Sequence, residues 1–281
     1  MKKSLKIWST FIVFLFLFPI VLVLIPSELS EEIAVVSSDE RKLVYAANIF
    51  ETELEIQTPK IQSPKIQSGM RALLYATHSQ EAFEPITLKH DGKIAVYHEV
   101  ANIMKLSKTI GSQLEFNGVE ANIIDVDFTA EMNKAGIPFH KSYDVARPYV
   151  QKALKDGEYD IIIDIHRDSL KADRTTVTYK GEKFAQVVFV VGGDHANFKF
   201  NQELSKKLMA SMEKEVPNIT KNIVFKSGHG VDGKYNQDLH KRLVLVEMGG
   251  IGNNEAELGR TSAVLAKAIS QTLQSESISG K

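Results

Sequence analysis

The sequence contains no cysteine. This absence excludes disulfide bridges, a cysteine nucleophile and zinc sites built on thiolates. Any metal site in this chain must therefore use histidine and carboxylate ligands. An excess of charge of either sign is also absent, because 34 Lys and Arg face 35 Asp and Glu, for a formal net charge of −1. This balance argues against a dedicated nucleic-acid-binding protein, which would carry a basic surface.

Charge is missing altogether from one stretch near the N-terminus. Residues 7–25 hold no charged side chain over 19 positions, which is about enough to cross a hydrocarbon core ~30 Å thick. Lys2, Lys3 and Lys6 precede this stretch, so the positive-inside rule puts the N-terminus in the cytoplasm. We predict a transmembrane anchor over residues 1–26, in a single-pass cell-membrane protein whose remainder is extracytoplasmic. The alternative is a cleaved signal peptide, but the run is long for one and no clean Ala-x-Ala site follows.

Residues 27–69 differ in composition from the rest of the chain. They include two copies of Pro-Lys-Ile-Gln-Ser, at 59–63 and 64–68. Two prolines and no periodic apolar face favour an extended linker. The remaining length and its ordinary apolar content suit one large catalytic domain, which we predict at residues 70–275.

Short apolar runs alternate with amphipathic segments in the first half of this domain. They predict the order strand, helix, strand, helix, strand at 72–76, 96–115, 119–126, 142–156 and 160–165. Such an order is typical of a parallel sheet. Further along we expect a hairpin, a helix, two strands and a closing helix, at 175–191, 197–215, 222–225, 243–246 and 255–273. The fold class predicted is α/β, with three α/β/α layers and a mostly parallel sheet.

Ionisable side chains follow three of these predicted strands, namely His78, His166 and Glu247. In a parallel sheet the carboxyl ends of the strands meet at one crevice, so these residues should converge. His78-x-x-Glu81 offers two ligands from one turn, and with His166 it makes the His₂Glu set of hydrolytic zinc sites. We predict zinc on His78, Glu81 and His166, and Glu247 as the carboxylate that takes and returns a proton.

Several residues near this crevice leave alternatives open. Glu81 could instead begin a helix, where an acidic side chain suits the helix dipole. The pair His98-Glu99 could then supply the third ligand in its place. Asp164 could orient the imidazole of His166, or it could be a buried carboxylate bonded to backbone amides.

Arg167 and a glycine-rich loop are further candidates for the site. Arg167 could bind a substrate carboxylate, although pairing with Asp168 is favoured. The loop at 228–233 is not a phosphate loop, because it lacks the Lys-Ser/Thr ending and the helix that follows it. Asn236 and Gln237 after it could line a substrate groove.

Five segments resemble the stage II sporulation protein P family of spore-forming bacteria. They are Thr77-His78-Ser79-Gln80-Glu81, Asp164-Ile165-His166-Arg167-Asp168-Ser169, Gln186-Val187-Val188-Phe189-Val190-Val191-Gly192, Tyr235-Asn236-Gln237-Asp238-Leu239 and Val246-Glu247-Met248-Gly249-Gly250. The likeness runs from about Arg71 to Leu273, in order and at suitable spacings, and the N-terminal anchor is also similar.

This resemblance implies an amidase-like fold and a zinc-dependent N-acetylmuramoyl-L-alanine amidase acting on peptidoglycan. It also implies cleavage of peptide cross-links, a role in engulfment during sporulation, and partners that include a lytic transglycosylase. By the same resemblance, His78, Glu81 and His166 hold zinc and Glu247 is the catalytic carboxylate.

The sequence departs from the family in three places. The segment 83–95 is short, Ala76 stands where members often have a second histidine, and the region before Arg71 is brief, which puts the family's partner contacts in doubt. Two other functions are left open: a zinc peptidase that cuts cross-links, and a non-catalytic wall-binding module. The intact set of His78, Glu81, His166 and Glu247 argues against the module.

Overall fold

The structure, a computed structural model, describes residues 69–279. The predicted anchor at 1–26, and the predicted linker as far as residue 68, lie outside the described residues. Within residues 69–279, no helix is both long enough and apolar enough to cross a membrane.

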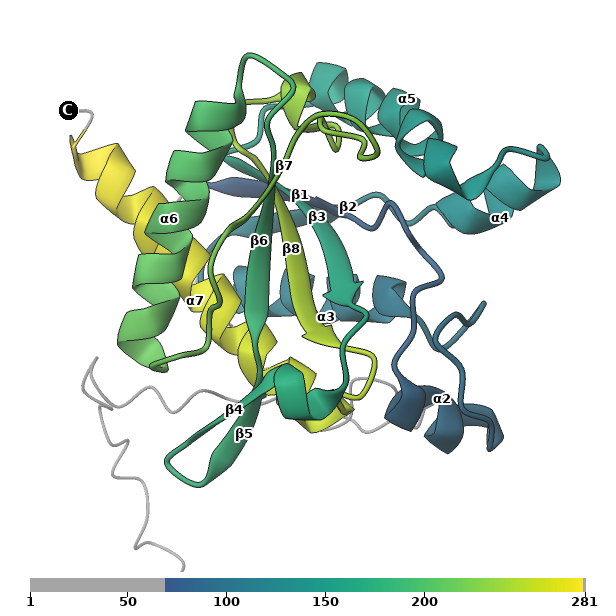
Figure 1. Cartoon of the computed structure of the whole chain (residues 1–281). Coiled ribbons are helices and arrows are strands. Elements are labelled where there is room, and N and C mark those ends of the chain that lie inside the picture. The colour runs from purple at the N-terminus through teal and green to yellow at the C-terminus, as the bar shows by residue number, and fades with distance from the viewer. Residues whose placement is uncertain (1–68, 280–281) are drawn as a thin grey trace, which may run out of the picture. The chain divides into compact units, whose positions relative to one another are not determined.

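A six-stranded sheet forms the centre of the described residues, with the strand order β2-β1-β3-β8-β6-β7 (Figure 1). The strands are β1 (Arg71–Tyr75), β2 (Glu120–Ile123), β3 (Ile161–Asp168), β6 (Val187–Gly192), β7 (Val224–Lys226) and β8 (Leu243–Gly250). β2, β1, β3 and β8 run parallel, whereas β6 is antiparallel to β8 and parallel to β7. The prediction of a mixed α/β fold with a mostly parallel sheet is confirmed.

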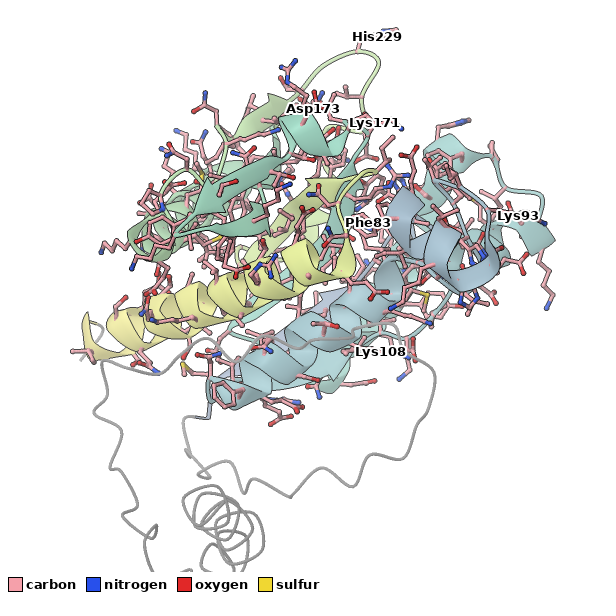
Figure 2. All side chains as sticks on the ribbon, turned by 90° about the horizontal axis from the view of Figure 1, so that it is seen from below. Phe83, Lys93, Lys108, Lys171, Asp173 and His229 are labelled. Atoms are coloured by element: carbon pink, nitrogen blue, oxygen red, sulfur yellow. The ribbon has the colours of Figure 1, made fainter. Side chains whose placement is uncertain are left out.

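Helices cover both faces of this sheet because its central strands are apolar on both sides. Ile161, Ile163 and Ile165 of β3 join the core formed with α3 (Ile103–Phe116), α6 (Phe198–Glu215) and α7 (Glu255–Ser279). Ile162 faces the other way, against α5 (Ser142–Asp156) and α4 (Phe128–Lys134). α3 and α7 lie side by side beneath the sheet (Figure 2).

The two strands that carry site residues extend further than their apolar runs. The predicted strands at 160–165 and 243–246 continue to Asp168 and Gly250. His166 and Glu247 therefore lie within β3 and β8, and not after them. The expectation of residues beyond the strand tips was wrong here, because a ladder of backbone hydrogen bonds does not require apolar side chains.

The helix predicted at 96–115 begins only at Ile103. His98 prevents an earlier start, since its Nδ1 accepts hydrogen bonds from the amides of Val100 and Ala101 at 3.0 and 2.9 Å. Asn102 then caps the helix by accepting a hydrogen bond from the amide of Met104. Residues 96–102 are consequently an irregular segment that runs beside the turn carrying Glu81.

Some elements have no counterpart in the prediction. The helices α2 (Glu84–Asp91) and α4 are two of them, together with the short turns η1 (Phe139–Lys141), η2 (Ala172–Arg174) and η3 (Gln237–Leu239). The predicted hairpin is divided, because β4 (Thr176–Tyr179) pairs with β5 (Glu182–Ala185) in a separate two-stranded sheet. Only the following strand, β6, enters the main sheet.

Candidate metal centre

The turn after β1 brings the first two candidate ligands together. The amide of Glu81 donates a hydrogen bond of 2.9 Å to the carbonyl of His78 and closes the turn. As a result, His78 Nδ1 lies 3.4 Å from Glu81 Oε1. This tight spacing is the geometry expected when two side chains three residues apart bind one ion.

His166 completes the group from the neighbouring strand. β1 and β3 pair in parallel, and His166 Nδ1 lies 3.8 Å from Glu81 Oε2. Ligand atoms of His78, Glu81 and His166 all lie within 4.8 Å of one another, and no other group of three such residues occurs in residues 69–279. Glu99 is exposed and does not belong to the group, so the geometry favours Glu81 over Glu99.

The second ring nitrogen, Nε2, of each histidine also has the surroundings expected of a metal ligand. His78 Nε2 lies 3.0 Å from Ser142 Oγ, and His166 Nε2 lies 3.1 Å from Asp164 Oδ1. The second contact is not aligned as a hydrogen bond, so His166 Nε2 is buried without a hydrogen-bond partner in the described residues. Histidine ligands commonly have an oxygen at the second nitrogen, which fixes the ring and leaves the first nitrogen for the ion. Two imidazoles and one carboxylate, supported in this way, are a suitable donor set for zinc.

Asp164 combines the two roles that its position in the sequence left open. It is fully buried and accepts hydrogen bonds from the amide and the hydroxyl of Thr77, at 2.9 and 2.7 Å. It also lies against His166. Burial by itself lowers the pKa of His166, but the charges of Asp164, Glu81 and Glu247 outweigh it and raise this pKa to about 9. Three carboxylates therefore surround the His166 ring.

Glu247 lies beside His166 on the next strand. The register of β3 and β8 pairs His166 with Glu247, so the two side chains are on the same face of the sheet. Burial raises the pKa of the Glu247 carboxyl, and the nearby charge of Asp168 raises it further. The carboxylate makes no hydrogen bond or ion pair with the described residues. It is available to a bound molecule.

The structure explains why glycine occupies positions 249 and 250, shortly after Glu247. Gly249 adopts a positive φ of 64°, which residues with a Cβ rarely do. A Cβ on Gly250 would lie 2.1 Å from the carbonyl oxygen of Leu170. The Glu-x-Gly-Gly motif thus lets β8 pass close to the segment after β3, at the point where their register shifts.

The Arg167 side chain stabilises the backbone around the metal group, and we do not count it among the residues that would bind the ion or the substrate. Its Nε donates to the carbonyl of Ala82 at 3.0 Å, and its second terminal nitrogen to that of Val96 at 2.7 Å. Its only contact with Asp168 is to the backbone oxygen at 3.5 Å, so the predicted carboxylate pair is wrong. The amide of Arg167 donates to Glu81 Oε2 at 3.1 Å, which orients the carboxylate. Nothing in the local sequence signals this role.

Asn236 and Gln237, expected to line a groove, are buried instead. Gln237 accepts from the amide of Gly192 and donates to the carbonyl of Val190, at 2.9 and 2.8 Å. Asn236 donates to the carbonyl of Tyr143 at 3.0 Å. Both residues hold the loop to the sheet and to α5.

Tyr143, at the start of α5, is a site neighbour that sequence reasoning did not single out. Its ring stacks on His166 with centroids 6.2 Å apart, and Tyr235 packs edge-on against it at 5.2 Å. A tyrosine in the first turn of an amphipathic helix carries no signal in the sequence that would separate it from a packing residue.

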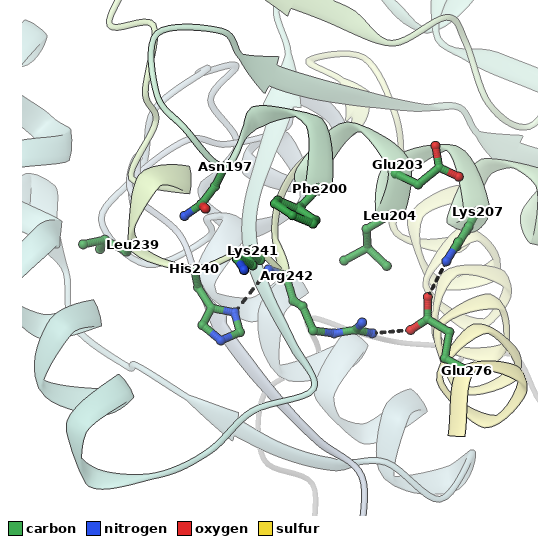
Figure 3. A pocket seen from close by; sticks show the side chains of 10 residues that line it. All are labelled: Asn197, Phe200, Glu203, Leu204, Lys207, Leu239, His240, Lys241, Arg242 and Glu276. Carbon is green, nitrogen blue, oxygen red and sulfur yellow. Dashed lines mark hydrogen bonds and ion pairs between the residues drawn. The ribbon is translucent and has the colours of Figure 1, made fainter. Parts of the chain in front are cut away.

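A cavity of about 610 Å³ lies away from the metal group, between α6 and the residues before β8 (Figure 3). Arg242, in its lining, immediately precedes β8, whereas Glu247 lies in the C-terminal half of that strand. Glu276 pairs with both Lys207 and Arg242 there, each at 2.8 Å. None of the proposed ligands lines this cavity, so the candidate chemistry is not located in it.

Comparison with known proteins bears on this arrangement. Residues 27–270 match the family model described as stage II sporulation protein P (SpoIIP). The chain belongs to the stage II sporulation protein P family. Over 199 residues it is 36% identical to stage II sporulation protein P of Bacillus subtilis (strain 168), covering 70% of this chain and 50% of that one. This SpoIIP-family chain therefore spans about half the length of the curated relative it matches. The family resemblance read from the motifs is confirmed.

Solved structures show the fold of this SpoIIP-family member. The CwlD amidase from Clostridioides difficile, solved in complex with the GerS lipoprotein, superposes with a TM-score of 0.50 at 13% identity. The match covers 73% of this chain and 99% of that chain. A metallo-carboxypeptidase from Burkholderia cenocepacia has a TM-score of 0.46 at 12% identity, covering 76% and 59% of the two chains. The likeness to the CwlD amidase shows that the amidase-like fold expected for the SpoIIP-family chain is present.

Proposed function

We propose that this SpoIIP-family protein is a zinc-dependent peptidoglycan hydrolase that acts in sporulation. Its reaction is hydrolysis of the amide between N-acetylmuramic acid and the stem peptide, as in an N-acetylmuramoyl-L-alanine amidase. One observation carries the proposal: His78, Glu81 and His166 meet within 4.8 Å, and Glu247 is paired in register with one of them. A ligand set with an adjacent free carboxylate is the minimum required for metal-assisted hydrolysis.

In the proposed mechanism, His78, Glu81 and His166 would hold the zinc ion. When bound, zinc would polarise the scissile carbonyl and lower the pKa of a water molecule towards neutrality. Glu247 takes the proton from the attacking water and gives it to the departing amine. Its raised pKa suits this exchange, because a carboxylate that is too acidic returns a proton poorly. Ser142 orients the imidazole of His78, and the Asp164 carboxylate lies beside that of His166.

The proposal extends to location and partners. Residues 1–26 would anchor the protein in the cell membrane, with the catalytic domain on the outer side, where peptidoglycan lies. Lys2, Lys3 and Lys6, which precede the apolar run, support this orientation. A lytic transglycosylase is the partner that the family resemblance suggests.

Product analysis tests the reaction. The full-length protein, in detergent, is incubated with purified peptidoglycan in the presence of zinc or of a chelator, and the products are identified by mass spectrometry. Zinc-dependent release of stems that begin with alanine, leaving free lactyl groups on the glycan, supports the amidase. Cut cross-links with stems still attached would indicate the peptidase instead. Binding to the wall with no zinc-dependent cleavage would indicate the non-catalytic module.

A further inference from the structure

Two exposed aromatic side chains, Phe139 and Tyr97, lie next to the metal group. We call this pair the aromatic shelf. Phe139 is 48% exposed and Tyr97 is 50% exposed, and their rings meet at right angles with centroids 6.4 Å apart. The Phe139 ring lies 4.6 Å from that of His78. Exposed large apolar side chains beside a reactive site are a typical feature of a binding surface.

The shelf is held in position by neighbours on its buried side. The guanidinium of Arg167 lies over the Tyr97 ring, 5.5 Å from its centroid. The backbone of Tyr97 forms an isolated bridge with Glu81, which ties it to the ligand turn. Phe139 belongs to η1, and the helix that follows begins with Ser142, which contacts His78. Such fixed rings lose little conformational entropy when a ligand covers them.

Two charged side chains near the shelf, Arg167 and Lys141, already have partners. Arg167 is bonded to two backbone carbonyls. Lys141, two residues after Phe139, pairs with Asp144 at 3.1 Å. The exposed rings of Phe139 and Tyr97 offer an apolar surface, which suits an uncharged ligand with one apolar face.

We propose that the aromatic shelf binds a sugar ring of the glycan strand by stacking. A pyranose ring has a face of C–H groups that packs on aromatic rings and a rim of hydroxyls that stays in water. This inference rests on the proposed function, because it assigns the sugar next to the scissile amide to the surface beside the metal group.

The test begins with binding and needs no catalysis. Peptide-free oligosaccharides of alternating N-acetylglucosamine and N-acetylmuramic acid are titrated into the full-length protein by calorimetry. We expect Phe139→Ala and Tyr97→Ala to weaken binding about tenfold each, as loss of an aromatic contact does. Phe139→Trp should bind at least as well as the native protein. Phe200→Ala is the matched control, because Phe200 is 53% exposed on α6, away from the metal group.

A kinetic comparison then separates stacking from a structural effect on His78. The substrates are a disaccharide-peptide and a sugar-free lactoyl-peptide with the same amide. In Phe139→Ala, the preference for the sugar-bearing substrate should fall about tenfold, mainly through KM. An equal loss on both substrates, or unchanged oligosaccharide binding, would overturn the proposal. If the native protein binds the oligosaccharides but cleaves neither substrate, the proposed function is wrong, whereas sugar binding by the aromatic shelf is still supported.

Discussion

Ser142 Oγ lies 3.0 Å from His78 Nε2. Ser142 is the first residue of α5, so the helix that covers one face of the sheet also contacts a proposed metal ligand. Asp164 Oδ1, from the interior of β3, lies 3.1 Å from His166 Nε2, in a contact that is not aligned as a hydrogen bond. Each imidazole therefore has an oxygen from a helix or a strand beside its second nitrogen, and not one from a flexible loop, which suits a preorganised metal site.

The first prediction concerns this support. Ser142→Ala should weaken zinc binding about tenfold to a hundredfold, because loss of the oxygen at Nε2 leaves the His78 ring free to turn. Competition with a chromogenic chelator measures the affinity. Ser112→Ala, on the exposed side of α3, is the control and should bind zinc like the native protein. Equal affinity in Ser142→Ala would mean that the rings of Phe139 and Tyr143, with centroids 4.6 and 5.7 Å from that of His78, hold the His78 ring without Ser142.

The second prediction separates ligand from base. His166→Ala should lose both zinc and activity. Glu247→Ala should retain zinc but lose ~10²–10⁴ in kcat, the usual contribution of general acid–base catalysis. Metal content by mass spectrometry and turnover on peptidoglycan are measured on the same preparations. Loss of zinc from Glu247→Ala would contradict its assignment as the base and make it a ligand.

The sheet and the ligand group could be predicted from the sequence because their signals are local. Apolar β-branched runs such as Ile161–Ile163 indicate buried strands, and residues at the ends of parallel strands must lie near one another. The spacing of His78 and Glu81 likewise reports a single turn.

The supporting contacts could not be predicted, because they join residues far apart in the chain. Arg167 reaches the carbonyl of Val96 across 71 positions, and its type alone suggested an ion pair. The late start of α3 depends on the ring of His98, which captures amides that a helix would use. The apolar periodicity of a segment does not show whether one of its side chains accepts hydrogen bonds from backbone amides that a helix would otherwise use.

The third prediction follows from Arg167. Arg167→Met should lower the melting temperature, since the buried carbonyl of Ala82 loses its donor, at a cost of about 1–3 kcal/mol, whereas the carbonyl of Val96 keeps its bond from the amide of Ala82. It should also weaken zinc binding, because the side chain that braces the segments of Ala82 and Val96 beside the Glu81 turn is removed. Differential scanning calorimetry with and without zinc measures both effects. Arg174→Met, at an exposed position in η2, is the control.

In that experiment the informative quantity is the rise in melting temperature that zinc produces. A bound ligand stabilises the folded state in proportion to the logarithm of its concentration over Kd. A smaller rise in Arg167→Met than in the native protein means weaker binding. An equal rise, with a lower melting temperature in both conditions, would limit Arg167 to a role in stability.

The last prediction concerns pH and the loop that carries Tyr235. Arg147 of α5 donates two hydrogen bonds to the carboxylate of Asp238, at 2.9 and 2.6 Å, and a third to Asn236 at 3.1 Å. The bond from Arg147 lowers the pKa of Asp238 below its usual range. A carboxyl whose pKa is lower in the folded than in the unfolded state stabilises the fold above its unfolded pKa of about 3.9, and the effect is lost as the pH falls through the folded pKa.

Asp238→Asn should therefore melt at a lower temperature than the native protein between pH 5 and 8, by a constant difference. Below about pH 4 the difference should shrink, because the native carboxyl also becomes neutral. Thermal unfolding followed by circular dichroism across this range measures it, with Asp173→Asn on exposed η2 as the control. A difference in melting temperature that stays constant down to the lowest pH measured would mean that packing, and not the charge of Asp238, connects this loop to α5. In that case Tyr235 would be positioned by Asn236 and the packing against Tyr143.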